Sequence, residues 1–286
     1  MRTREATAVI QAAGATQWQP NLLRLSISRT IIELRQFFRD TRSAVFTFAF
    51  PVMLLVLFGG IISYTIKGPS GQLVNFRQYF ISGMIAAGII STTFNNLATW
   101  ISMDRQEGLL KRLSATPLPR PAYFAGKIGM ATIVTIIQVV IMLAVGLAFY
   151  GLKLPADGAR WAMFFVVTAL GVAACCLAGI AYTRLIPNAR SAPAIIMPVY
   201  LVMEFISGVF FQFTDVPSWM QWVANVFPLR WMALGYRYVF LPDWFKSQET
   251  GGSWQVETTL AVLAVWVVVA FVLCIRWFRW DPEIDK

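Results

Sequence analysis

Few side chains in this sequence have the types and spacing that catalysis requires. Histidine, the commonest general base and metal ligand, is absent from all 286 residues. Cys175, Cys176 and Cys274 lie inside apolar segments without CxxC spacing, which indicates buried, unreactive thiols rather than a metal or redox site. Asp104 and Glu107 are three residues apart, but they lie in a short basic insert. We therefore expect neither an enzyme nor a metal site.

One acid, Glu204, lies midway along an apolar segment. A charge in hydrocarbon is costly, so such acids usually face a cavity or a partner. Tyr200, Glu204 and Phe211 are predicted to share a helical face, with Met197 and Ser207 beside it. Three interpretations stay open. The face lines a solute pathway, Glu204 is a structural acid that is protonated and hydrogen-bonded to a neighbour, or the helix begins later in the sequence.

The composition indicates that these residues are held by membrane helices. Hydrophobic residues make up 57% of the chain and charged residues only 13%, against roughly 25% charged in soluble domains. A helix needs roughly 20 apolar residues to cross a bilayer. Six segments qualify: about 44–64, 79–102, 127–150, 161–182, 194–213 and 256–276. We expect an all-α integral membrane protein with one membrane domain over residues 21–280.

The distribution of Lys and Arg predicts the orientation. The net charge of +10 comes from short loops that flank apolar spans, so it indicates topology rather than nucleic-acid binding. With the N-terminus inside, 17 Lys and Arg residues fall in inner segments and 7 in outer ones. The positive-inside rule then places both termini in the cytoplasm, with residues 1–20 as a flexible stretch and 281–286 as a tail. Residues 105–120 lie on the same side.

Two further segments are amphipathic. The stretch "PNLLRLSISRTIIELRQFFRDTRS" mixes apolar and basic residues at helical spacing, which predicts a helix along the inner membrane surface or a simple topology anchor. In the outer loop before the last span, one apolar helical face is predicted from residues at i, i+3, i+4 and i+7: Trp219, Trp222, Val223 and Val226. Pro228 breaks this pattern and Trp231 resumes it. Two half-helices that dip into the outer leaflet, or an aromatic loop on its surface, fit this pattern.

The insert "RQEGLLKRLSATPLPR" at 105–120 combines charge, leucine and proline. Leu109, Leu110 and Leu113 are predicted to share one side of a short helix. Glu107 precedes Lys111 by four residues, the favourable order for a helical ion pair. Thr116 precedes Pro117, which disfavours helical conformation there. A solvated loop needs no leucine face, so the insert is interpreted as a surface that docks into another protein.

These residues resemble a known family. The stretch "RQEGLLKRLSATPLPRPAYFAGK" is similar to the first cytoplasmic loop of type-2 ABC transporter permeases, which include exporters of the daunorubicin-resistance and polysaccharide types. The resemblance extends over essentially the whole chain, including the "NVFPLRW" segment near 225–231, and departs at Leu110, where a Thr-Leu pair is more usual. The residues that match are Glu107, Gly108, Leu109, Leu110, Arg112, Leu113, Thr116, Pro117, Leu118, Gly126 and Lys127.

The resemblance implies a coupling helix seated in a groove of a cytoplasmic ATPase subunit. ATP and Mg²⁺ then belong to that partner, because this chain has no GxxxxGK[ST] loop and needs no cofactor of its own. A second permease copy, identical or paralogous, is also implied, as is export of a drug, lipid or other amphipathic solute across a bacterial plasma membrane. The implied coupling residues are Arg105, Glu107, Gly108, Leu109, Leu110, Lys111, Arg112, Leu113, Thr116 and Pro117.

The resemblance also places the second and fifth spans beside a central cavity. The second span carries Gly83, Ala87, Ser91 and Asn95 at i+4 spacing, a pattern typical of close helix packing. Packing is the first interpretation of this stripe, and solute contact is the second. The expected pathway residues are Asn95, Asn96, Thr99, Met197, Tyr200, Glu204, Ser207 and Phe211. An outer gate is expected at Trp219, Trp222, Pro228 and Trp231.

The main alternative is a proton-coupled secondary transporter that uses Glu204 as its carrier. That class usually has more spans and several intramembrane acids. One acid and six expected spans therefore argue against it. A second alternative is a membrane enzyme such as an acyl or glycosyl transferase, against which the lack of histidine and of paired acids at the membrane face argues. An inactive scaffold subunit is a third, weaker alternative.

Overall fold

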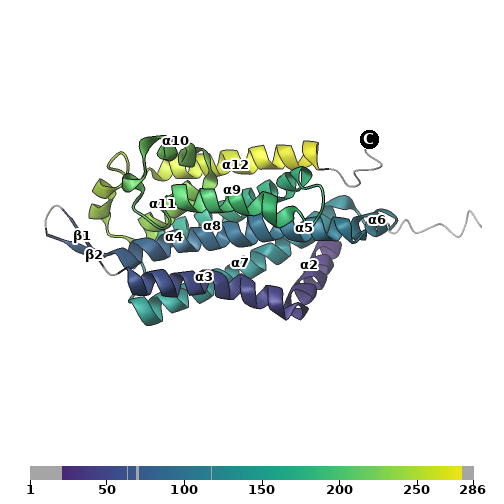
Figure 1. Cartoon of the computed structure of the whole chain (residues 1–286), viewed down its shortest axis with the longest axis horizontal. Coiled ribbons are helices and arrows are strands. Elements are labelled where there is room, and N and C mark those ends of the chain that lie inside the picture. The colour runs from purple at the N-terminus through teal and green to yellow at the C-terminus, as the bar shows by residue number, and fades with distance from the viewer. Residues whose placement is uncertain (1–20, 63, 69–70, 117, 279–286) are drawn as a thin grey trace, which may run out of the picture.

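The computed structural model describes residues 21–278 except 63, 69–70 and 117. The expectations for residues 1–20, Pro117 and the 281–286 tail fall outside the described residues. Figure 1 shows an elongated bundle of roughly parallel helices. A two-stranded hairpin, β1 (Thr65–Lys67) and β2 (Leu73–Asn75), lies at one end of it, and the short helix α6 (Leu109–Ser114) lies at the other.

The described residues contain five helices that are long and apolar enough to cross a membrane. They are α3 (Thr41–Ile61); the continuous run of α4 (Phe76–Ile90), η1 (Ser91–Asn96) and α5 (Leu97–Gln106); α7 (Arg120–Tyr150); α8 (Gly158–Tyr182) with η2 (Thr183–Leu185); and α12 (Val256–Trp277). These correspond to the first, second, third, fourth and sixth expected spans. The all-helical membrane fold is therefore confirmed.

The remaining expected span, 194–213, differs from the structure. Its helix, α9 (Ala192–Ile206), has 15 residues and so is about 22 Å long, shorter than the roughly 30 Å of a hydrocarbon core. The chain leaves the helix just before Gly208, whose φ of +74° is a left-handed conformation that glycine adopts without strain. Phe211 lies beyond this turn. The prediction that it shares a helical face with Glu204 is therefore wrong.

The helix α2 (Leu22–Arg39) crosses the end of the bundle at a steep angle to the other helices (Figure 1). Asn21 caps its start, and Asp40 caps the start of α3 by accepting hydrogen bonds from Ser43, which hold the pKa of the Asp40 carboxyl below its usual value. One side of α2 packs on α7, where a Cβ on Gly126 would lie 2.4 Å from Arg29 Cγ. Apolar side chains on its other side are exposed, as an interfacial helix requires.

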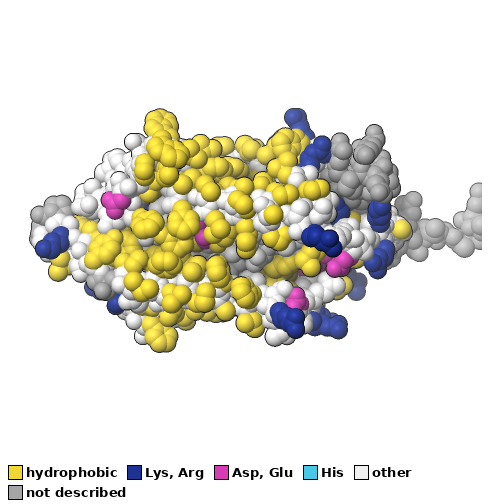
Figure 2. Space-filling model, in the orientation of Figure 1, with side chains coloured by type: hydrophobic (Ala, Val, Ile, Leu, Met, Phe, Trp, Pro, Cys, Tyr) yellow, Lys and Arg dark blue, Asp and Glu magenta, His cyan; other side chains and the backbone are white. Residues whose placement is uncertain are grey.

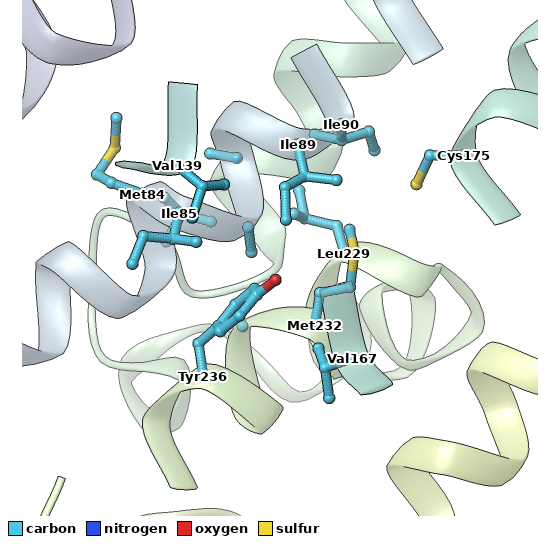
Figure 3. Packing of buried hydrophobic residues seen from close by; sticks show 14 of the residues in the cluster. Met84, Ile85, Ile89, Ile90, Val139, Val167, Cys175, Leu229, Met232 and Tyr236 are labelled. Carbon is cyan, nitrogen blue, oxygen red and sulfur yellow. The ribbon is translucent and has the colours of Figure 1, made fainter. Parts of the chain in front are cut away.

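The core is built around α4, which is buried along nearly its whole length. It packs against α7, α8 and α11 (Pro228–Phe240), and Figure 3 shows the side chains that meet there, including Ile85 of α4, Val139 of α7 and Tyr236 of α11. The helices α3 and α12 are far less buried. Figure 2 shows hydrophobic side chains across the middle of one face of the molecule, with Lys and Arg gathered mainly at the α6 end.

The central span contains a π-helical turn, η1, between α4 and α5. Such turns hold one residue more than a regular α-helical turn and are frequent at functional sites. Within it, Thr92 donates a short hydrogen bond to the side chain of Gln138 on α7. Both side chains are buried, so this bond ties the turn to the neighbouring span.

The remaining elements lie near the β-hairpin end. They are α10 (Ser218–Val226), η3 (Phe213–Asp215) and η4 (Asp243–Gln248) together with α11. The expected apolar face of α10 is confirmed, and it points out of the molecule, with Trp222 79% exposed. By contrast, α11 is almost entirely buried.

Candidate functional site

A buried ion-pair network joins three helices at the basic end of the molecule. Lys127 Nζ on α7 lies 2.7 Å from Glu33 Oε2 on α2 and 2.7 Å from Asp104 Oδ2 on α5. Arg29 Nη2 lies 2.6 Å from Glu33 Oε1, and the Tyr123 hydroxyl donates to Asp104 Oδ2 at 2.8 Å. The side chains of Lys127 and Glu33 are 4% and 2% exposed. The network therefore fixes α2, α5 and α7 to one another.

Sequence reasoning missed this network. Its members lie in three separate segments, and hydropathy treats each charge as a marker of a helix end. The available signal was an acid, Glu33, inside a helix whose other charges are basic, and a lysine, Lys127, several residues inside the apolar helix that it was expected to begin.

The short helix α6 follows directly on this network. Gly108, at φ +71°, separates α5 from α6, so Glu107 and Lys111 lie on either side of a bend rather than on one helix. Leu110 is 1% exposed and packs with Leu113 against Tyr123 and Phe124. The prediction that all three leucines project outward for docking is therefore wrong, because Leu110 holds α6 to its own chain.

The exposed side chains of α6 and of the residues that flank it are mainly polar. Glu107, Lys111, Arg112 and Thr116 are exposed, whereas Leu109 is half-buried. Arg112 Nη2 donates to the Glu107 carbonyl oxygen at 2.8 Å, which braces the bend. The surface offered by this end is thus a charged ridge on a short, firmly anchored helix.

Arg105 has a different position from the one expected of a docking residue. Its guanidinium donates to the carbonyl oxygen of Thr183 at 3.0 Å and to the Thr183 hydroxyl at 3.2 Å. The next side chain, Gln106, accepts a hydrogen bond from the Ala189 N–H at 2.8 Å. These contacts attach the end of α5 to the connection between α8 and α9, a segment that sequence reasoning left without a role.

The intramembrane acid is buried and partnered. Glu204 is 2% exposed, and the Tyr200 hydroxyl donates to Glu204 Oε1 at 2.5 Å. Ser207 is also buried, whereas Met197 and Phe211 are 51% and 56% exposed. The structure therefore divides the expected pathway residues of this region into a buried trio and two surface residues. A role for Glu204 in a solute pathway stays a prediction.

The other expected pathway residues lie together around the π-helical turn. Asn95 donates to Asn96 Oδ1 at 3.2 Å, Asn96 donates to Thr47 Oγ1 on α3 at 3.4 Å, and Thr99 donates to the Asn95 carbonyl oxygen at 2.8 Å. All three are partly buried. Their polar groups are thus engaged within the chain, and solute contact by them stays a prediction.

Comparison with known proteins identifies the family. The model of the ABC-2 type transporter family matches residues 23–241, which is most of the chain. The chain belongs to the ABC-2 type transporter family. It is 22% identical over 225 residues to the inner membrane transport permease YadH of Escherichia coli K12, covering 78% of this chain and 81% of that one. It is 24% identical over 229 residues to the putative transport permease ycf38 of Cyanophora paradoxa, covering 78% of each.

This ABC-2 type permease is therefore a multi-pass membrane protein and a transport subunit. The β-hairpin end of the molecule holds a second buried charge cluster. Arg237, fully buried, lies 3.2 Å from Glu249 Oε1, and Arg230 lies 3.2 Å from Glu249 Oε2. Arg237 also donates to the Gly208 carbonyl oxygen and stacks on the Tyr79 ring at 3.9 Å. The cluster fixes the turn after α9 to both α11 and α4.

The expected outer-gate residues of the permease do not form one site. Trp219 and Trp222 on α10 are exposed. Pro228 and Trp231 on α11 are buried, and Trp231 Nε1 donates to the Asn225 carbonyl oxygen at 2.8 Å. Gating by these residues stays a prediction, and the exposed pair is placed to contact lipid or another subunit.

Proposed function

We propose that this chain is the membrane-spanning permease subunit of an ATP-driven ABC exporter. Separate cytoplasmic ATPase subunits, which bind ATP and Mg²⁺, dock on residues 105–120 at the basic end and supply the energy. Two permease copies, identical or paralogous, move an amphipathic solute such as a drug or a lipid-linked molecule across the bacterial plasma membrane. The basic end and both termini lie in the cytoplasm, in line with the positive-inside rule.

The anchoring of α6 carries this proposal. A coupling element has to transmit a displacement rather than absorb it, and α6 is held on two sides. Leu110 packs on Tyr123 of α7, and Arg105, just before the bend, bonds to Thr183 after α8. Through Lys127 the same end is joined to α2. A force on α6 would therefore be transmitted to α2, α5, α7 and α8.

The exposed ridge of α6 provides the first test. In a reconstituted complex of this permease with its ATPase, we expect the reversals Glu107→Arg and Arg112→Glu each to lower permease-dependent ATP hydrolysis about tenfold, since a reversed charge at an interface costs enough binding energy for such a change. Lys153→Glu, an exposed reversal at the opposite end, is the matched control. Membrane insertion and elution of all three variants are checked in parallel.

Hydrolysis that stays at the wild-type rate in both α6 variants, with a complex that still forms, would contradict docking at this ridge. A panel of amphipathic drugs and lipids added to the same assay addresses the solute. A compound that stimulates hydrolysis in the wild type, and not in the α6 variants, identifies the solute class.

Replacing Glu204 separates this proposal from the proton-coupled alternative. In Glu204→Gln the amide oxygen still accepts the Tyr200 hydrogen bond, so we expect ATP-driven transport to stay within about twofold of wild type, with no dependence on an imposed proton gradient. Transport into proteoliposomes with and without ATP measures both. Gradient-driven transport by the wild type that disappears in Glu204→Gln would favour the secondary transporter instead.

The apolar outer surfaces support pairing with a second permease copy. Exposed residues Leu201, Val202 and Phe205 of α9 lie beside Trp219 and Val223 of α10 around one hollow. A patch of this kind suits either lipid or another helix surface.

A further inference from the structure

A narrow apolar pocket lies apart from the α6 ridge. It is enclosed by α8, α9, α12 and the end of α4, and its volume is about 230 Å³. Small side chains, Ala178, Ala181 and Ala270, make room for it. Apolar cavities of about 150 Å³ already bind benzene-sized molecules, so a pocket of this size accommodates part of a hydrocarbon chain.

The pocket is elongated along the helices. Its α12 wall extends from Trp266 to Trp277, eleven residues apart and therefore about 16 Å at the rise of an α-helix. Phe227 stacks on Trp266 at a ring separation of 6.3 Å and bounds the outer end. At the other end the wall is formed by Leu185 and Trp277, beside the basic surface. Its long axis thus runs roughly parallel to the spans, as a lipid acyl chain does.

A cationic side chain stands at the basic end of the pocket. Arg184 is exposed, and its Nη1 donates to the Trp277 carbonyl oxygen at 3.2 Å, which places the guanidinium next to the lining residues Leu185 and Trp277. A guanidinium has five N–H donors, so most remain available to an anion. Arg276, also exposed, lies in the same last turn of α12. Arginine binds phosphate oxygens in a bidentate manner.

We propose that this pocket binds one anionic phospholipid of the leaflet at the basic end. An acyl chain lies between α8, α9 and α12, and the headgroup phosphate lies on Arg184 and Arg276. An apolar groove alone would accept any hydrocarbon, but the arginines at its basic end select an anion. Basic pockets between spans on the cytoplasmic side bind anionic lipids in this manner. The inference does not depend on the solute or on ATPase docking.

Photolabelling of the wild-type permease tests the site directly. The purified full chain is placed in phosphatidylcholine nanodiscs with a trace of phosphatidylglycerol that carries a diazirine in its acyl chain. We expect adducts concentrated on residues 175–185, 199–203 and 266–277. Unlabelled phosphatidylglycerol should compete for them, and added phosphatidylcholine should not. Adducts spread evenly over the exposed faces of α3 and α7, or equal competition by both lipids, would overturn the proposal.

Two substitutions test the tail and the headgroup contacts separately. Ala178→Leu fills the pocket and should remove the localised adducts, whereas Val140→Leu on the exposed face of α7 should not. Arg184→Gln should lower the preference for phosphatidylglycerol about tenfold, since it removes charge-assisted bonds to phosphate. Arg190→Gln, an exposed arginine in the same connection, should leave that preference intact. Equal losses in Arg184→Gln and Arg190→Gln would mean general surface attraction and no site. If Ala178→Leu does not fold, the distribution of photolabelled residues in the wild type still decides the question.

Discussion

Lys127→Met is expected to lower the unfolding temperature of the detergent-solubilised permease by about 6 to 20 °C, because breaking a buried ion pair typically costs about 3 to 5 kcal/mol and each kcal/mol shifts a chain of this size by about 2 to 4 °C. The substitution keeps the length and apolar volume of the side chain. It leaves Glu33 with Arg29 alone and removes the only cation that the structure gives Asp104 among the described residues. Fluorescence-detected elution after heating measures the change.

The control is Lys246→Met, which removes an exposed lysine from the η4 segment. Its unfolding temperature should stay close to wild type, since surface charges contribute little. A triple variant, Lys127→Met with Glu33→Gln and Asp104→Asn, should recover part of the loss because no buried charge is then left without its partner. If Lys127→Met and Lys246→Met unfold at the same temperature, the network does not hold α2 to the bundle.

Glu249→Leu is expected to have a comparable or larger effect. Among the described residues, Glu249 is the one carboxylate within ion-pair distance of two buried arginines, Arg230 and Arg237, whose side chains are 3% and 0% exposed. Two like charges would then remain buried beside one another, and the loss again corresponds to about 3 to 5 kcal/mol or more. The permease should fail to accumulate in membranes, or should elute as aggregate at growth temperature.

Asp243→Leu is the matched control for Glu249→Leu. Asp243 also pairs with an arginine, Arg160, at 2.6 Å, but its side chain is 73% exposed. A pair of this kind contributes at most about 1 kcal/mol, so Asp243→Leu should express and elute as wild type. A second variant, Arg230→Met with Glu249 intact, keeps the 1:1 pair with Arg237 and should be milder. Normal expression of Glu249→Leu would show that the cluster does not stabilise the β-hairpin end.

The sequence predicted what depends on local composition. Long apolar runs bounded by basic residues identified five spans, with ends within about four residues except at α7, which begins seven residues before the expected start. The alternation of apolar and basic residues identified α2. The apolar face of α10 followed from the spacing of two tryptophans and two valines. Each of these patterns lies within one segment and is determined by contact with the bilayer. Predicting these helices therefore required no knowledge of contacts between segments.

Contacts between segments could not be predicted in this way. Nothing local pairs Glu33 with Lys127, or Arg237 with Glu249, because the partners come from different helices or loops. The leucines of α6 show the same limit. Their spacing correctly indicated a helix with an apolar side, but spacing does not say whether that side faces a partner or, as for Leu110, the chain's own Tyr123.

The prediction for Phe211 was wrong because the chain turns at Gly208. The apolar run continues past Ile206 without a polar residue large enough to mark an end, whereas α9 ends at Ile206 and the chain turns at Gly208. The carbonyl oxygen of Gly208 accepts a hydrogen bond from buried Arg237, so the turn is fixed by a side chain 29 residues away. The spacing of residues within one segment carries no information about that contact.

The π-helical turn of the central span changes the direction in which the side chains of α5 point relative to those of α4. An α-helix rotates about 100° per residue, so one extra residue in a turn changes the direction of every side chain that follows. The run Gly83, Ala87, Ser91 and Asn95 is therefore continuous in spacing but not in direction. Gly83 lies against Val209, while Asn95 pairs with Asn96. An insertion or deletion between residues 91 and 96 would consequently rotate α5 about its axis relative to α4. The loss of one residue there would turn Arg105 away from Thr183 while leaving the core around α4 in place.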